Sequence, residues 1–366
     1  MRDFCKYVIF VVVVIATQTI LFQSVSAIEP APAQNAAANP AEGKFNPGEF
    51  IFEHINDAYS WHVVTFRDYQ VAIPLPVILY SSHSGWHVFM SSKFQHGHSS
   101  YLGFEIAKEG SSKGKIVELV GNKAEAVAFD ISITKNVFAL LICVALILWL
   151  FLSIAGNYKR NPQSAPSGMQ SLFEPLILFV RDDIARPSIG EHKYEKYMPY
   201  LLTVFFFILF NNLLGLLPTF PGGANLTGNV AITLVLALFT FVITTFSGNK
   251  SYWVHMVNTP GVPWWLKLPV PLIPLIEVMG MFIKPFVLMV RLFANMLAGH
   301  IIALGFFSLI FIFGAMNAYL GYSVSVFSVA FAIFMSMLEL LVAFIQAYVF
   351  TLLSAIYFGM AIEEHH

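Results

Sequence analysis

The sequence predicts an all-α polytopic membrane protein with about five membrane helices, the last two long and tilted as a hairpin, preceded by a small exported segment. Three observations support this fold class. Of the 366 residues, 57% are hydrophobic and only 11% are charged, a composition typical of integral membrane proteins. Several apolar runs are long enough to cross a bilayer. Lysine and arginine cluster after the first of these runs, as expected of a cytoplasmic loop.

The first 27 residues read as a secretory signal peptide. Arg2 and Lys6 precede an apolar core, and Val25-Ser26-Ala27 forms a small-residue cleavage site. The apolar core is slightly long, so an uncleaved anchor is the alternative. In both cases the following segment, residues 28–130, is expected to be exported, and residues 131–366 form the membrane domain.

The exported segment divides into a linker and a small soluble part. Residues 28–47 are rich in Ala, Pro and Asn and predict a disordered linker. From about Gly48 to Phe129 the chain looks soluble, and the short runs Gln70–Ile73 and Trp86–Met90 predict strands.

Six histidines lie in the soluble part and raise the question of a metal site. No tight ligand motif accompanies them, so solvated surface histidines are the better interpretation. The six residues are His54, His62, His83, His87, His96 and His98. The two cysteines, Cys5 and Cys143, fall in the leader and in a predicted membrane helix, which excludes a disulfide framework.

The first membrane helix is predicted from about Lys135 to Gly156. Basic residues follow it and place the next loop in the cytoplasm; they are Lys159, Arg160, Arg181, Arg186, Lys193 and Lys196. Within this loop, residues 168–184 alternate apolar and polar positions at helical spacing. This helix either lies on the membrane surface or packs on soluble partners.

Two further spans are predicted at residues 197–217 and 229–247, separated by an external turn at 218–228. Two longer apolar stretches follow at 272–313 and 324–362. Each would be roughly 60 Å long as a helix, about twice the hydrocarbon thickness. Each is therefore two spans or one strongly tilted helix. The turn signals between them cluster at Gly314, Asn317, Gly321 and Ser323, which favours one antiparallel hairpin.

The first of these stretches carries charged residues that are costly in hydrocarbon. Glu277, Lys284 and Arg291 are spaced by seven and form one stripe, and Asn295 follows one turn later. An arginine at mid-membrane costs at least about 2.5–3.5 kcal/mol on insertion scales. Arg291 is either a snorkelling anchor, which needs a helix end nearby, or a functional residue facing a partner or a wet cavity.

The second stretch supplies polar residues at matching depths. If the pair folds at about residues 318–320, Arg291 falls level with Gln346, and His300 falls level with Glu339. His300 lies nine residues after Arg291 and so points to the opposite face of its helix. Polar groups in hydrocarbon need partners, and this register supplies them.

The stretch Arg291-Leu-Phe-Ala-Asn-Met-Leu-Ala-Gly299 resembles the signature of the subunit a family of F-type ATP synthases. The runs Asn212–Pro218 and Ile345–Tyr348 also fit, and the resemblance covers residues 130–366. It implies a proton-translocating stator with two half-channels beside a ring of c-subunits, in a bacterial inner membrane with the N-terminal segment outside and the C-terminus in the cytoplasm. It also implies association with the b-subunit stalk and the remainder of the synthase, no cofactor or metal, and no enzymatic activity by the chain alone. A net charge of −1 gives no electrostatic case for nucleic acid.

The resemblance also implies roles for individual residues. Arg291 would face the essential carboxylates of the ring, with Asn295 and Gln346 beside it, and Glu277 would lie toward the cytoplasmic half-channel. The full proton path would include Glu277, Lys284, His300, Glu339 and Asn212. In this reading Arg291 makes an arriving ring acid release its proton, because a fixed cation favours the charged form of a nearby carboxylate.

The chain departs from the family pattern in three places. Several bacterial members have glutamate where His300 stands and histidine where Glu339 stands, so acid and base are exchanged here. Gly215 replaces an acid that is often found in the Asn212–Pro218 run, and the exported segment is an addition. Two other classes, a secondary transporter and a membrane scaffold, compete with the stator hypothesis. A transporter should show inverted repeats with broken helices, and we find none.

Overall fold

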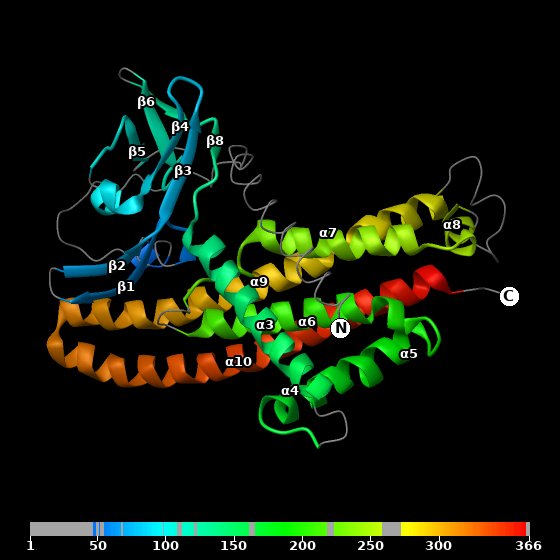
Figure 1. Ribbon diagram of the computed structural model, residues 1–366. Helices are drawn as coiled ribbons and strands as arrows, with labels where there is room; N and C mark the ends of the chain where they lie inside the picture. The colour runs from blue at the N-terminus through cyan, green and yellow to red at the C-terminus, as the bar shows by residue number, and fades with distance from the viewer. Residues whose placement is uncertain are drawn as a thin grey trace.

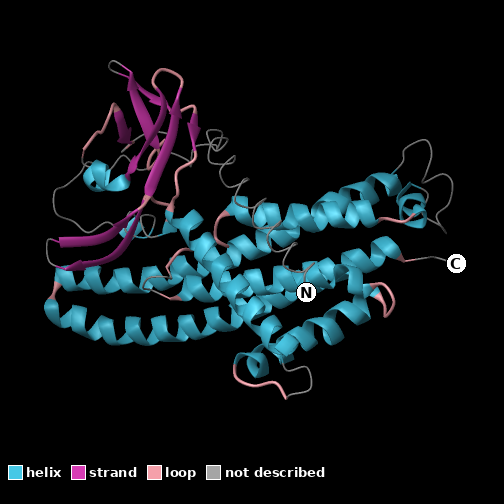
Figure 2. Ribbon diagram, in the orientation of Figure 1, coloured by secondary structure: helices cyan, strands magenta, loops and turns pink. Residues whose placement is uncertain are grey.

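The computed structural model describes residues 47–48, 51, 55–66, 69–97, 99–107, 112–120, 123–160, 165–217, 223–257 and 272–363. They form a small β domain and a bundle of long helices (Figure 1). The strands gather at one end of the bundle (Figure 2). The predicted signal peptide and nearly all of the predicted linker lie outside the described residues.

The β domain is built from three small antiparallel sheets with the orders β1-β2, β4-β3-β8 and β5-β6-β7. Their strands are β1 (Ser60–Phe66), β2 (Tyr69–Pro74), β3 (Pro76–Ser81), β4 (Gly85–Met90), β5 (Phe104–Ile106), β6 (Ile116–Val120), β7 (Lys123–Ala126) and β8 (Phe129–Asp130), with a 3-10 helix, η2 (Ser91–Gly97), after β4. Both strands predicted from alternation are present, within β2 and β4. The side chains of Val77, Leu79, Phe94 and Phe104 form the centre of a separate apolar core.

The β domain is joined directly to the first long helix, α3 (Lys135–Arg160). The carboxylate oxygen Oδ1 of Asp57 accepts hydrogen bonds from the backbone N–H groups of Ala58 and Asn136, both at 3.0 Å. Burial raises the pKa of the Asp57 carboxyl, and the hydrogen bond from Asn136 opposes this effect. The rings of Trp61 and Phe138 also meet, with centroids 5.8 Å apart. A residue of the β domain therefore caps the N-terminus of a membrane helix.

In the described part of the chain, five helices are long and apolar enough to cross a membrane, which agrees with the predicted number. They are α3, α6 (Tyr194–Leu216), α7 (Val230–Ser247), α9 (Leu272–Met316) and α10 (Ala318–Ile362). The shorter helical segments are α4 (Met169–Phe179), the π-helical η3 (Val180–Ala185), α5 (Arg186–Ile189) and α8 (Lys250–Val257).

The last two helices are single, 45-residue elements, so the alternative of two spans in each stretch is wrong. Pro285 lies inside α9 without ending it. The turn consists of Asn317 alone, slightly earlier and tighter than predicted, and its side chain caps α10 by accepting from the N–H of Tyr319. Each helix is about 68 Å long, so both must tilt strongly in a bilayer.

The helices pack around α6. Leu201, Phe205, Phe206 and Ile208 of this helix are fully buried, and α10 packs against α6, α9 and α5. In each spanning helix we consider the 18-residue window that is most apolar. In α6, 67% of this window is buried, but in α9 and in α10 only 17% is buried. The outward faces of the hairpin therefore need lipid or another protein to cover them.

The segment from α4 to α5 carries the predicted cytoplasmic helix and packs onto the bundle. Val180, Ile184 and Ile189 join the main core, and Gly359 of α10 approaches so closely that a Cβ there would overlap the carbonyl oxygen of Ser188. Figure 1 shows the turn between α9 and α10 at the end of the bundle that carries β1 and β2, and α8 at the opposite end. The β domain and α8 therefore lie at opposite ends of the bundle (Figure 1).

Because Asp57 satisfies the N–H of Asn136, Asp57→Ala should lower the thermal unfolding midpoint of the detergent-purified chain. The expected loss of stability is about 0.5–2 kcal/mol, the usual contribution of a helix cap. Asp57→Asn keeps the accepting oxygen and should retain most of the stability. Unfolding measured by circular dichroism tests this; equal effects of the two substitutions would contradict the capping role.

Candidate functional site

The predicted charged stripe lies on α9. In the middle of this helix, the stripe faces away from the core of the bundle. Arg291 and Asn295 are exposed, whereas Leu288, Leu292 and Met296 on the other side of the helix are buried. Arg291 thus stands on the apolar outward face of the hairpin, roughly five helical turns after Leu272 and roughly seven before Met316, so it is far from either end of α9. The position does not suit a snorkelling anchor, which needs a helix end nearby.

The prediction that Arg291 and Gln346 lie at the same depth along the hairpin is confirmed. Both residues line one small pocket of about 190 Å³, together with Leu288, Leu292 and Phe350. The Gln346 side chain is buried and accepts a hydrogen bond from Nδ2 of Asn212 on α6, at 3.1 Å. Asn212, assigned to the proton path, therefore contacts the residue beside Arg291.

The chain of hydrogen bonds continues to a residue that sequence reasoning missed. The hydroxyl of Thr227 donates to Oδ1 of Asn212 at 2.7 Å, and Thr227 is buried although it lies in the segment between α6 and α7. A threonine in a turn rich in Asn and Gly carries no signal of such a contact, so only the fold reveals it.

His300 and Glu339 come together as predicted. A Cβ on Gly299 would overlap the Glu339 carboxylate, which therefore lies directly against α9 beside His300. The His300 ring places Nδ1 3.0 Å from the carbonyl oxygen of Met296 and Nε2 3.4 Å from that of Gly215. A carbonyl oxygen only accepts, so the neutral ring satisfies one of these contacts at a time.

Gly215, where the resemblance led us to expect an acid, faces His300 with its backbone carbonyl. An added Cβ would lie at ordinary contact distances, 3.5 Å from the carbonyl oxygen of Ala224 and 3.8 Å from Cε of Met296.

A second polar region lies near the end of the bundle that carries α8 (Figure 1). A pocket of about 340 Å³ is lined by Thr240, Phe241, Thr244, Tyr252, Met281, Lys284, Pro285, Tyr357 and Met360. The Nζ of Lys284 lies 5.4 Å from the centroid of the Tyr357 ring. Burial, together with the negative charge of Glu277, raises the pKa of the Tyr252 phenol. Glu277 and Lys284 are thus both associated with this pocket.

A buried row of hydroxyl groups adjoins the pocket and was also not predicted. The Tyr200 hydroxyl lies 2.9 Å from that of Thr240, which lies 3.1 Å from that of Ser354. All three residues are buried. They come from α6, α7 and α10, so their sequence separation hides the contact.

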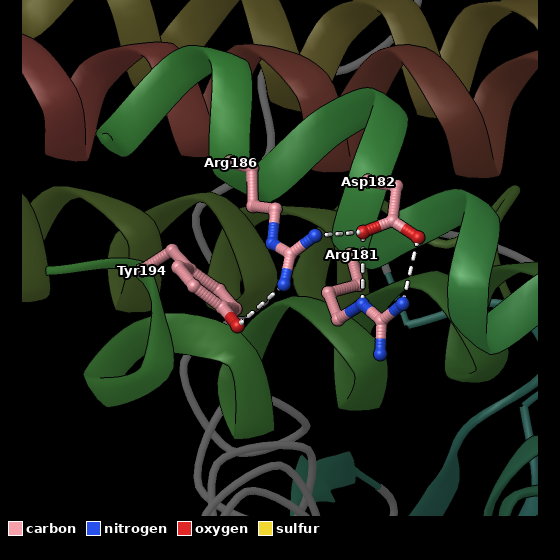
Figure 3. A network of polar contacts seen from close by, with 4 residues as sticks. All are labelled: Arg181, Asp182, Arg186 and Tyr194. Carbon is pink, nitrogen blue, oxygen red and sulfur yellow. Dashed lines mark hydrogen bonds and ion pairs between the residues drawn. The ribbon is translucent and has the colours of Figure 1, made fainter. Parts of the chain in front are cut away.

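A third polar cluster lies at the surface, on η3, α5 and α6 (Figure 3). The Arg181 guanidinium donates two hydrogen bonds to Asp182, both at 2.8 Å, and these lower the pKa of the Asp182 carboxyl. Arg186 donates to the same carboxylate at 2.8 Å and to the Tyr194 hydroxyl at 3.4 Å. The residues are exposed enough that the network orders a surface turn more than it stabilises the fold.

The candidate metal site in the β domain gains no support from the described residues. Within them, no three His, Cys, Asp or Glu side chains approach closely enough to hold an ion. Nε2 of His87 instead lies 2.9 Å from the Ser84 hydroxyl. His54 and His98, and the side chains of His62 and His96, lie outside the described part.

Two family models match the chain. A family model described as ATP synthase A chain matches residues 137–359, more than half of the chain, and a model described as a domain of unknown function (DUF8433) matches residues 50–137. The chain is 44% identical over 252 residues to ATP synthase subunit a of Chloroherpeton thalassium, covering 66% of this chain and 71% of the relative. It is 50% identical over 244 residues to ATP synthase subunit a 2 of Chlorobaculum tepidum, covering 65% of each chain. The relative from Myxococcus xanthus, also named ATP synthase subunit a, is 44% identical over 243 residues, with 65% and 75% covered. The chain belongs to the ATP synthase A chain family.

Proposed function

We propose that this chain is the proton-translocating stator subunit of an F-type ATP synthase, with two half-channels that open against a rotating ring of c-subunits. Family membership supports the proposal. The observation that carries it is the exposure of Arg291 on the outward apolar face of α9. An arginine facing lipid there would cost at least about 2.5–3.5 kcal/mol, so this face calls for a partner with an opposite charge.

The two polar regions lie on opposite sides of Arg291 along α9. Lys284 of the cytoplasmic pocket precedes it by seven residues, roughly 10 Å, and His300 follows by nine residues, roughly 14 Å. Between these regions the helix is apolar apart from Arg291 and Asn295. This layout suits two offset half-channels that communicate only through a moving carrier.

In the proposed mechanism a proton enters from the exterior past Glu339 and His300 and neutralises a ring carboxylate. The carboxylic acid then travels around with the ring and releases its proton to the pocket near Glu277 and Lys284. Arg291 favours the ionised form of the carboxylate that reaches it and repels protons that would leak between the half-channels. Arginine suits this task because it stays charged when desolvated.

We also propose which subunits and which membrane surround the chain. The hairpin would face the c-ring, the b-subunit stalk would hold the chain static, and the whole would sit in a bacterial inner membrane. The driving force is the transmembrane field, about 2.3 kcal/mol per charge per 100 mV. The chain would supply the path for protons while other subunits perform the chemistry of ATP.

Replacing Arg291 by alanine should abolish ATP-driven proton pumping, because α9 has no other permanent cation at this depth. The complex is reconstituted in vesicles, and acidification is followed with a pH-sensitive dye. Arg181→Ala, which removes an exposed arginine outside the spans, is the matched control and should pump normally. Wild-type pumping by the Arg291→Ala complex would overturn the proposed function.

Exchanging His300 and Glu339 should be tolerated better than losing either one, since the imidazole and the carboxylate would act as one relay. We expect His300→Ala or Glu339→Ala to slow passive proton conduction on the order of a hundredfold. The double exchange, His300→Glu with Glu339→His, should recover much of that loss. Conduction is measured in vesicles stripped of the catalytic head.

Independent effects of the two substitutions would argue against a coupled pair. A double exchange that conducts no better than the worse single exchange would also argue against a coupled pair. In either case the exterior half-channel would have to follow other residues.

The β domain should face the exterior, because basic residues crowd the loop after α3 and Asp57 fixes the domain to the start of α3. Protease added to intact spheroplasts should cleave within residues 48–130. Inverted vesicles should protect the same region. Cleavage only in inverted vesicles would reverse the topology and with it the direction of both half-channels.

A further inference from the structure

The hydrogen-bond chain from Thr227 through Asn212 to Gln346 connects the turn between α6 and α7 to the neighbourhood of Arg291. Its members are almost fully enclosed, with 1%, 0% and 4% of their surfaces exposed, respectively. Thr227 and Asn212 have their hydrogen bonds satisfied within the chain, whereas Nε2 of Gln346 is buried and has no partner among the described residues. The unpartnered end of the chain therefore lies at the pocket that Arg291 lines.

The donor-to-acceptor direction of these hydrogen bonds is set by the backbone carbonyl of Ala343. Nδ2 of Asn212 lies 3.4 Å from the carbonyl oxygen of Ala343, which can only accept a hydrogen bond. The amide nitrogen of Asn212 must therefore face α10, and its oxygen must face Thr227. The Thr227 hydroxyl is then the donor at 2.7 Å.

The same direction determines which end of the Gln346 amide faces Arg291. Because Asn212 presents a nitrogen, Gln346 must turn its oxygen toward Asn212. Its nitrogen is left as a free donor at the pocket lined by Arg291. Two donors, a guanidinium and an amide, then meet at one place, and an ionised carboxylate is the group that accepts from both.

We propose that Thr227 is a positioning residue: through Asn212 it holds the Gln346 nitrogen toward the Arg291 pocket, as a second donor for the carboxylate presented by the partner. This inference rests on the proposed function. With the opposite orientation, Gln346 would present an oxygen that competes with the carboxylate for Arg291. The correct orientation favours the ionised carboxylate and so lowers its pKa at this site.

The test is Thr227→Val, which keeps the shape of the side chain but removes the donor. Proton pumping by the complete complex is measured across a pH range and normalised to assembled complex. Without the second donor the pKa of the carboxylate at the site rises, so release needs a higher pH. The acid limb of the pH profile should move upward by about half to one unit, and pumping on that limb should fall roughly fivefold.

Three matched variants separate positioning from general stability. Thr227→Ser keeps the donor and should restore the wild-type profile. Thr233→Val removes another buried hydroxyl, which donates to the carbonyl oxygens of Asn229 and Val230 in its own helix region, and should leave the profile in place. In a Gln346→Leu background, Thr227→Val should add nothing further, since both act through the same amide. If Thr227→Val does not assemble, Thr227→Ala takes its place.

A wild-type pH profile for the Thr227 variant, or a full additional effect in the Gln346→Leu background, would overturn the positioning role. Arg291→Ala is assayed in parallel. If it abolishes pumping while the Thr227 variant is normal, the inference fails and the proposed function stands. If the Arg291→Ala complex pumps normally, the proposed function itself fails.

Discussion

The cost of an unpaired polar group in hydrocarbon is the constraint on which the rest of the structure depends. Each such group costs several kcal/mol, and the membrane helices pair most of theirs. Ser308, Ser336 and Thr351 donate to carbonyl groups one turn earlier in their own helices. Two of the exceptions in the described part, Nε2 of Gln346 and Oε1 of Glu339, lie beside Arg291 and His300. Under the proposed function, these two unpaired groups lie where a moving partner would supply what the chain lacks.

Close helix contacts keep these groups in place. At Gly299, Gly321 and Gly359 a side chain would overlap a facing residue, so the helices approach more closely there than larger residues allow. Around them α6 forms a dense aromatic core. A stator must hold its charge still while a neighbour moves past it, and close packing of this kind suits that task.

Much of this arrangement could be predicted from the sequence because it follows from helix geometry. The absence of breaks in the last two apolar stretches predicted single helices, and counting from the turn brought Arg291 to Gln346 and His300 to Glu339. The residues that could not be predicted act between elements far apart in the chain. Asp57 caps a helix from another domain, and Thr227 reaches Asn212 from a turn. Such contacts depend on how elements meet in space, which no local periodicity records. The π-helical turn at η3, which brings Arg181 and Arg186 to one carboxylate, also has no simple sequence signal.

The turn between α9 and α10 consists of a single capped residue, and this limits how the gene can change. A turn without slack cannot absorb an inserted or deleted residue in either helix. One extra residue between Arg291 and Asn317 would rotate every earlier side chain by about 100° relative to α10 and move it by about 1.5 Å. Length changes in this half of the protein should therefore be tolerated only as compensating pairs or whole turns. The segment before α3 lies outside the register of this hairpin, so variation in chain length among relatives should accumulate there.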